Sequence, residues 1–150
     1  MINRFETFTV LINRISRNIR KIKNLEMADY NLRSPHISCL YYLYISGGLT
    51  ATQLCEKCEE DKATISRSID FLEENGYIIC QSKNLKKYKS PITLTDKGED
   101  ISEKIAMKIN NVLDEVSMEL NEEERIAFYR SLSIISDSLD SIVKKCEEKE

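Results

Sequence analysis

The stretch CEKCEEDKATISRS, residues 55–68, contains two features that point to different kinds of site. Cys55 and Cys58 form a C-x-x-C pair, a spacing found in zinc sites and in redox-active thiols. An acidic turn follows, and then a segment in which Asp61 has the position of a helix N-cap. This second feature is typical of the second helix of a helix-turn-helix motif.

The sequence around this stretch favours the helix-turn-helix. Helices are predicted over three ranges: 34–46, 50–58 and 61–75. Ser34-Pro35 is typical of N-cap and N1 in the first helix, and Gly47-Gly48 ends it. Thr50 with Gln53 predicts a capping box for the second helix, and Gly76 is the expected glycine after the third. The inner face of the third helix would carry apolar residues at helical spacing, namely Ile65, Ile69 and Leu72.

A short hairpin is predicted directly after these helices. The segments YIICQ (77–81) and PITLT (91–95) are rich in strand-forming residues, and the polar segment KNLKKYK (83–89) lies between them. Helix, helix, turn, helix and hairpin is the element order of a winged helix-turn-helix. We therefore predict a mainly α-helical fold with a small β-hairpin wing.

Long amphipathic helices are predicted at both ends of the chain, and their apolar stripes are continuous enough to form a dimer interface. Thr95 is the expected N-cap of a helix over about 96–119, and Asn121 with Glu124 predicts a capping box for the last helix. An intramolecular bundle is the alternative use of these stripes. The predicted dimerisation residues are Phe5, Phe8, Ile12, Ile15, Phe128, Leu132, Ile135, Leu139 and Ile142. The chain would then consist of an N-terminal dimerisation helix (1–33), a winged helix-turn-helix (34–95) and C-terminal dimerisation helices (96–150).

The C-x-x-C pair is predicted to consist of core cysteines. A zinc site needs two further ligands, and a set of Cys55, Cys58, Cys39 and His36 has no recognised spacing. A thioredoxin-type motif would follow a strand and open a helix, whereas this pair ends a helix. Cysteine packs as a modest hydrophobe, so we expect no metal and no cofactor, with thiol or oxidant sensing as the alternative.

The distribution of charge along the chain favours a nucleic-acid partner, although the net charge alone would argue against one. The 150-residue chain carries a net charge of −3, but residues 62–97 hold seven Lys or Arg against four Asp or Glu. A basic face of this kind is suited to phosphate contact. There is no long apolar run for a bilayer and no secretory signal, so a cytoplasmic protein with reduced thiols and no membrane partner is expected. Neither a Ser/His/Asp set nor a phosphate-binding loop is present, so we do not expect an enzyme.

The segment LTATQLCEKCEEDKATISRSIDFLEENGYI (49–78), followed by LTDKG (94–98), resembles the MarR family, the multiple-antibiotic-resistance-type regulators. The resemblance implies a homodimeric transcriptional regulator, in the first place a repressor, that binds palindromic double-stranded DNA. The second helix of the motif would enter the major groove and the wing would contact the minor groove. Carried over by position, the DNA-binding residues are Thr50, Thr52, Lys62, Thr64, Ser66, Arg67, Lys83, Asn84, Lys86 and Lys87.

The sequence departs from the family pattern at two places. The usual Asp-x-Arg of the wing falls on Lys86-Lys87-Tyr88, so lysine charge replaces the planar arginine fork. Glu59 stands where a glycine commonly makes the turn. Because a positive φ would be strained for glutamate, we expect the turn to be reshaped.

A small-molecule effector is common among members of the family, and His36, Cys39 and Tyr42 are the candidate ligand-binding residues. They lie in HISCLYYLY (36–44), which is also typical of a core helix with amphipathic tyrosines. Because fold alone does not fix function, a dimeric winged-helix module that binds no DNA is a second class of function.

Overall fold

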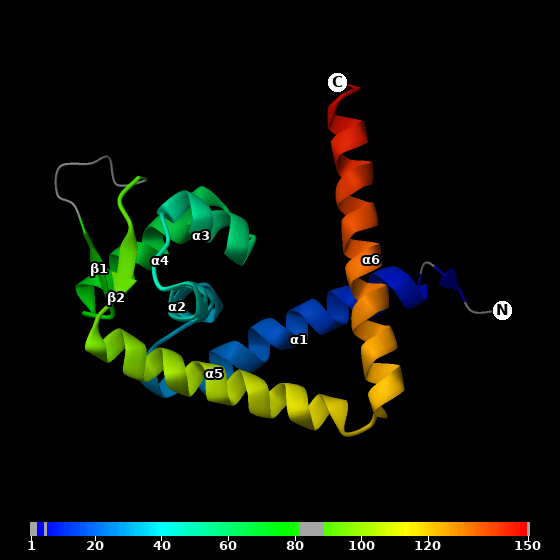
Figure 1. The fold of residues 1–150 in the computed structure, drawn as a ribbon, viewed down its shortest axis with the longest axis horizontal. Helices are drawn as coiled ribbons and strands as arrows, with labels where there is room; N and C mark the ends of the chain where they lie inside the picture. The colour runs from blue at the N-terminus through cyan, green and yellow to red at the C-terminus, as the bar shows by residue number, and fades with distance from the viewer. Residues whose placement is uncertain (1–2, 5, 82–88, 150) are drawn as a thin grey trace. The chain divides into compact units, whose positions relative to one another are not determined.

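The helices and the hairpin predicted from the sequence are present in the structure, a computed structural model that describes residues 3–4, 6–81 and 89–149 (Figure 1). The helices are α1 (Leu11–Glu26), α2 (Ser34–Ser46), α3 (Ala51–Cys58), α4 (Lys62–Glu74), α5 (Asp96–Ser117) and α6 (Glu122–Glu147). The strands are β1 (Ile78–Cys80) and β2 (Ile92–Leu94). A π-helical turn (Glu6–Val10) precedes α1 and a 3-10 turn (Ala28–Tyr30) follows it. The mainly α-helical winged fold is thus confirmed.

The chain divides into two units, Met1–Lys108 and Ile109–Glu150. The first unit contains α1 to α4, the hairpin and the first part of α5. The second contains the end of α5 and α6. The core of the molecule lies in the first unit, where every buried apolar residue of the described chain is found.

Helix α2 is the centre of that core. It packs against α1, α3, α4 and β2, and Leu40 and Leu43 on it are almost completely inaccessible to solvent. The apolar residues predicted for the inner face of α4, namely Ile65, Ile69 and Leu72, are all buried. The helix-turn-helix is therefore held by apolar packing on one central helix.

The helix starts follow local capping rules, with one correction. Thr50 and Gln53 form the predicted capping box, in which the Gln53 N–H donates to Thr50 Oγ1 at 3.2 Å and the Thr50 N–H donates to Gln53 Oε1 at 2.9 Å. The prediction that Ser34 is the N-cap of α2 is wrong by one residue. Arg33 is the cap, and Ser34 is the first helical residue because its N–H donates instead to Asn24 Oδ1 at 2.7 Å.

The turn between α3 and α4 is not reshaped, contrary to the expectation for Glu59. Glu59 takes the left-handed conformation with φ of 51°, which in a glycine would carry no steric cost. Its N–H donates to the Cys55 carbonyl and so closes α3 in the usual way. The chain therefore accepts local backbone strain to keep the turn.

The hairpin is antiparallel, and Ile78 pairs with Leu94 and Cys80 with Ile92. A further bridge, not predicted from the sequence, joins Leu49 to Ile92, with backbone bonds of 3.1 Å and 2.8 Å. Leu49, just before α3, thus pairs with β2 like a residue of a third strand. This bridge joins the segment that precedes α3 to the hairpin. The hairpin residues 82–88 lie outside the described residues.

The LTDKG segment joins the end of α4 to the start of α5. Thr95 is the predicted N-cap, since its Oγ1 accepts the Gly98 N–H at 3.0 Å. The same hydroxyl donates to the Gly76 carbonyl at 2.6 Å, just after α4. A Cβ atom on Gly98 would lie 1.9 Å from the Tyr77 carbonyl oxygen. Glycine is therefore required here by the close approach of the Tyr77 backbone.

Lys97 makes the same connection with its side chain. Its ammonium donates to the Asn75 carbonyl at 2.7 Å and lies 4.4 Å from the centre of the Tyr77 ring. The residues that end α4 thus each receive a contact from the residues that begin α5. We call this set of contacts, made by Thr95, Lys97 and Gly98, the α4–α5 clasp.

Gly98→Ala tests the close approach within the clasp. In an ordinary helix position this change would stabilise the protein by about 1 kcal/mol. Here we expect the free energy of unfolding to fall by about 1–3 kcal/mol, because the added methyl group must displace backbone. Urea denaturation followed by circular dichroism measures the difference. Glu99→Ala, at the next and exposed position, is the control and should change the free energy by less than about 0.5 kcal/mol. A stabilised Gly98→Ala protein would contradict the assignment.

Candidate nucleic-acid interface

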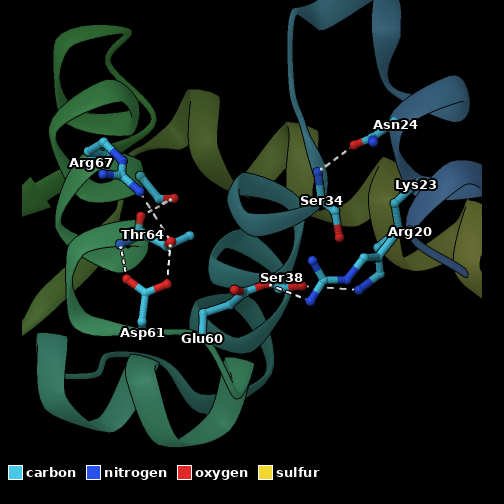
Figure 2. A network of polar contacts seen from close by, with 10 residues as sticks. Arg20, Lys23, Asn24, Ser34, Ser38, Glu60, Asp61, Thr64 and Arg67 are labelled. Atoms are coloured by element: carbon cyan, nitrogen blue, oxygen red, sulfur yellow. Dashed lines mark hydrogen bonds and ion pairs between the residues drawn. The ribbon is translucent and has the colours of Figure 1, made fainter. Parts of the chain in front are cut away.

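The first two turns of α4 carry a network of three polar side chains (Figure 2). The carboxylate of the N-cap Asp61 accepts the Thr64 N–H at 2.8 Å and the Thr64 hydroxyl at 2.8 Å. The Arg67 guanidinium donates to Thr64 Oγ1 at 3.3 Å. Because these residues are spaced three apart, they lie on one side of the helix. The network orients Arg67 along the exposed face of α4.

Hydrogen bonding also fixes the charge state of Asp61. The Thr64 N–H and then the Thr64 hydroxyl hold the pKa of this carboxyl below its ordinary value, and nearby Arg67 acts in the same direction. Asp61 is therefore a carboxylate that both caps the helix and balances part of the arginine charge. Ser68 also contacts Thr64, from the buried side of α4, because its hydroxyl donates to the Thr64 carbonyl at 2.8 Å.

The predicted DNA-binding residues differ in how accessible they are. Lys62 and Arg67 are exposed, whereas Thr64 and Ser66 are half-buried. On α3, Thr50 serves as the N-cap and Thr52 is exposed. The predicted wing residues lie outside the described residues and remain predictions, namely Lys83, Asn84, Lys86 and Lys87.

Helix α1 contacts the helix-turn-helix through polar residues that were not predicted from the sequence (Figure 2). Arg20 forms an ion pair with Glu60, in the turn before α4, at 3.4 Å. Lys23 donates to the Ser38 hydroxyl on α2 at 3.0 Å. These contacts tie α1 to the turn and to α2, and the Arg20 charge balances that of Glu60, one of the acidic residues that precede α4.

The candidate ligand-binding residues face neighbours inside the helix-turn-helix. The His36 ring stacks on Phe71 of α4 with ring centres 4.3 Å apart and an interplanar angle of 7°. Cys39 is fully buried. The Lys57 ammonium lies 5.9 Å from the centre of the Tyr42 ring, and burial raises the pKa of the Tyr42 phenol. These contacts favour the core-helix alternative for the HISCLYYLY segment.

His36 also completes the start of α2. Its Nδ1 accepts the Arg33 N–H at 3.1 Å, which requires an unprotonated nitrogen. Burial, and secondly the positive charge of Arg33, lower the pKa of His36. The folded protein therefore favours the neutral ring.

Metal-binding clusters and membrane spans are both absent from the described part of the chain. No group of three or more His, Cys, Asp or Glu side chains among residues 3–4, 6–81 and 89–149 is placed so that it could hold a metal ion. Within the same ranges, no helix is long and apolar enough to cross a membrane.

A helix-turn-helix with exposed cations on its second helix, followed by a hairpin, defines a winged helix-turn-helix DNA-binding protein. The family model that matches this chain, over residues 30–82, is that of the MarR family. An uncharacterised HTH-type transcriptional regulator of Bacillus subtilis, YwoH, is 29% identical over 117 residues, which cover 78% of this chain and 85% of the relative. The chain is thus similar to the MarR family of transcriptional regulators, with the family model matching residues 30–82.

Solved structures confirm that the fold extends over most of the chain. The Staphylococcus aureus MepR–DNA complex has a TM-score of 0.78 at 20% identity and covers 88% of this chain and 97% of MepR. Bordetella bronchiseptica BpsR, a protein whose DNA binding is regulated by 6-hydroxynicotinic acid, has a TM-score of 0.77 at 21% identity. That alignment covers 87% of this chain and 99% of BpsR. At these identities the likeness concerns the fold.

The lowered pKa of His36 predicts a pH dependence of stability. As the pH drops below the ordinary histidine pKa of about 6.5, His36 becomes protonated in the unfolded chain but stays neutral in the folded protein. Protonation therefore stabilises the unfolded chain, and the free energy of unfolding falls. The fall levels off below the folded pKa. In the His36→Gln protein the new amide can still accept the Arg33 N–H but does not titrate, so this part of the dependence should be lost. Urea denaturation of both proteins from about pH 7.5 to about pH 5.5 measures it. Parallel curves for the two proteins would contradict the prediction.

Proposed function

We propose that this protein is a homodimeric repressor that binds a palindromic operator and is released by a small molecule. The observation that carries the DNA part is the pair of exposed cations, Lys62 and Arg67, on the first two turns of α4. The N-terminal turns of a recognition helix are the part that meets base edges and phosphates. DNA binding by this fold is supported by MepR, which shares the fold and whose structure was solved as a complex with DNA.

Arg67 is the residue to which we assign base recognition. Its guanidinium can bind the O6 and N7 atoms of guanine in a bidentate manner. The contact with Thr64 holds the side chain in place before DNA arrives, which reduces the entropy lost on binding. Lys62, Thr50, Thr52 and Ser66 are assigned to phosphate or peripheral contacts. The wing residues, Lys83, Asn84, Lys86 and Lys87, are assigned to phosphates because of their charge.

The homodimer is supported by apolar residues that the single chain leaves exposed. None of the described residues of α1 or α6 is buried. Their predicted stripe residues are substantially accessible, for example Ile15 at 53% and Leu132 at 42%, while Phe5 lies outside the described residues. Large exposed apolar surfaces of this kind mark protein interfaces. A two-fold dimer would cover them and would present two recognition helices at a fixed spacing, which a palindromic site requires.

Release by a small molecule is supported by BpsR, whose DNA binding is regulated by 6-hydroxynicotinic acid. The contacts of His36, Cys39 and Tyr42 give them a packing role, so they do not define the ligand. A winged-helix module that binds no DNA is the competing function. The exposed cations on α4 favour the regulator over this module, because a protein-binding surface has no need for them at that position.

DNA binding by the purified protein tests the proposal directly. We expect it to bind a fragment of its own promoter region, with an affinity that falls steeply as salt is raised. Arg67→Ala should lose about 1–3 kcal/mol of specific binding, measured by fluorescence anisotropy, because a bidentate base contact is removed. Arg125→Ala, a matched arginine on α6, is the control and should bind as tightly as the wild type. Unchanged affinity in Arg67→Ala would remove Arg67 from the interface, and no duplex binding at low salt would favour the non-DNA module.

Leu132→Glu tests the dimer. A charge in the apolar stripe of α6 would be buried without a partner in the interface, so we expect a monomer at micromolar concentration. Ser133→Glu is the matched control, because helical spacing places it away from the stripe. It should remain a dimer. Sedimentation equilibrium measures both, and a dimeric Leu132→Glu protein would show that this stripe is not the interface.

A further inference from the structure

Helix α1 is attached to the helix-turn-helix by polar side chains rather than by apolar burial. None of the residues of α1 is buried, and its apolar stripe is accessible to solvent, with Ile15 at 53%. The contacts come from Arg20, Lys23 and Asn24 (Figure 2). Because these residues are spaced three and four apart, they lie on one face of the helix. The attachment of α1 therefore depends on a small set of hydrogen bonds and charges.

The C-terminal end of α1 is fixed by the core. Met27, the residue that follows the helix, is 2% exposed, and Asn24 Oδ1 accepts the Ser34 N–H at the start of α2 at 2.7 Å. Lys23 donates to the Ser38 hydroxyl at 3.0 Å. A helix that is held at one end can still swing, so its direction needs a further attachment away from that end.

Arg20 supplies that attachment. It precedes Met27 by seven residues, which is about 10 Å along the helix axis. Its guanidinium lies 3.4 Å from the Glu60 carboxylate, and the Glu60 side chain is only 15% exposed. A carboxylate so far withdrawn from water is costly without a positive partner. The ion pair therefore holds the turn that contains Glu60 against α1.

Glu60 connects this contact to both helices of the motif. Its N–H donates to the Cys55 carbonyl of α3 at 3.3 Å, and the next residue, Asp61, is the N-cap of α4. The end of α3 is not deep in the core. Cys55 and Cys58 are half-buried, so the expectation that they are core cysteines holds only in part. A displacement of the Glu60 side chain is therefore passed directly to the start of α4.

We propose that Arg20 is a positioning residue for DNA recognition, because its ion pair with Glu60 fixes the angle between α1 and α4. The inference rests on the proposed homodimer, in which the exposed stripe of α1 forms part of the interface. When α1 is held by the partner copy, the angle between α1 and α4 decides where each recognition helix lies. Two such angles set the distance between the two copies of α4.

The distance between the two recognition helices matters because the DNA fixes it. The half-sites of a palindrome are about 34 Å apart, or a multiple of this. A dimer whose copies of α4 are loosely placed loses more entropy when it binds both half-sites, whereas a single half-site is bound equally well. Loss of the ion pair should therefore weaken binding to the full palindrome and leave binding to one half-site unchanged.

Binding to a palindromic duplex, selected by the wild-type protein from a random pool, tests the inference. We expect Arg20→Met to bind this duplex about fivefold more weakly, measured by fluorescence anisotropy, and to bind a duplex with a single half-site as the wild type does. Arg20→Lys, which keeps the charge, should stay within about twofold of the wild type. Arg17→Met, at an exposed position of the same helix, is the matched control and should leave both affinities unchanged.

A double variant separates positioning from charge neutralisation. In Arg20→Met/Glu60→Gln no unpaired carboxylate remains, so the urea midpoint should lie within about 0.3 M of the wild type. We expect the loss of palindrome affinity to persist, because the contact is still absent. Recovery of wild-type affinity would show that Arg20 only neutralises Glu60 and would overturn the inference. An equal loss of affinity for the single half-site would overturn it as well.

The distance between the two copies of α4 is measured separately, without DNA. A spin label on p-acetylphenylalanine in place of Glu73, an exposed residue of α4, reports this distance by double electron–electron resonance. The wild type and Arg17→Met should share one narrow distribution, and Arg20→Met should broaden or shift it. An unchanged distribution would contradict the inference.

The two measurements distinguish failure of the inference from failure of the proposed function. If the wild type selects no duplex but Arg20→Met changes the distance distribution, the DNA-binding part of the proposed function fails while the control of α4 spacing by Arg20 stands. If the wild type binds its duplex and Arg20→Met changes neither measurement, only the inference fails. Absence of any dipolar signal in the wild type would refute the dimer and the inference together.

Discussion

The burial of α2 is the constraint on which the DNA-binding part of the molecule depends. Four elements pack on this helix, and Leu40 and Leu43 lie at their junction with almost no exposure. Truncation of such a leucine costs about 2–5 kcal/mol, a large part of the stability of a small protein. Helix α5 joins the same centre, since the Ser102 hydroxyl donates to the Leu40 carbonyl at 3.4 Å. The direction in which α4 presents its outer face is therefore set by the packing of its inner face.

Given that packing, both ends of α4 are fixed by polar contacts of different kinds. Asp61 closes the start and Arg67 is oriented by the same network. The clasp closes the other end, where Thr95 and Lys97 bind the carbonyls that follow the helix. Because the clasp residues begin α5, α4 is joined through a short set of bonds to the first part of the next helix. Three residues of the LTDKG motif, Thr95, Lys97 and Gly98, therefore each have a structural role in this connection.

Local rules predicted most of the fold. The capping boxes at Thr50 and Asn121 and the Asp61 cap follow from residues three apart, and the structure confirms all three. Contacts between distant residues could not be predicted in this way. Arg20 with Glu60 and His36 with Phe71 each join separate parts of the chain, and their pairing depends on crossing geometry that a single sequence does not encode locally. Glu59 shows a further limit, because tertiary packing outweighed its backbone preference. The wing contacts and the dimer remain predictions.

Helix α1 combines two tasks that bear on regulation. One side carries the exposed apolar stripe with Ile15, and other positions hold Arg20 and Lys23 against the turn and α2. The Arg20 side chain is 61% exposed, and ion pairs at such sites contribute only about 0–1 kcal/mol. Coupling between two sites in a protein is typically about 1–3 kcal/mol, the sum of a few contacts of this strength. A signal that breaks the Arg20–Glu60 and Lys23–Ser38 contacts would therefore involve free energies of the size that couples two sites, while the core around α2 stays intact.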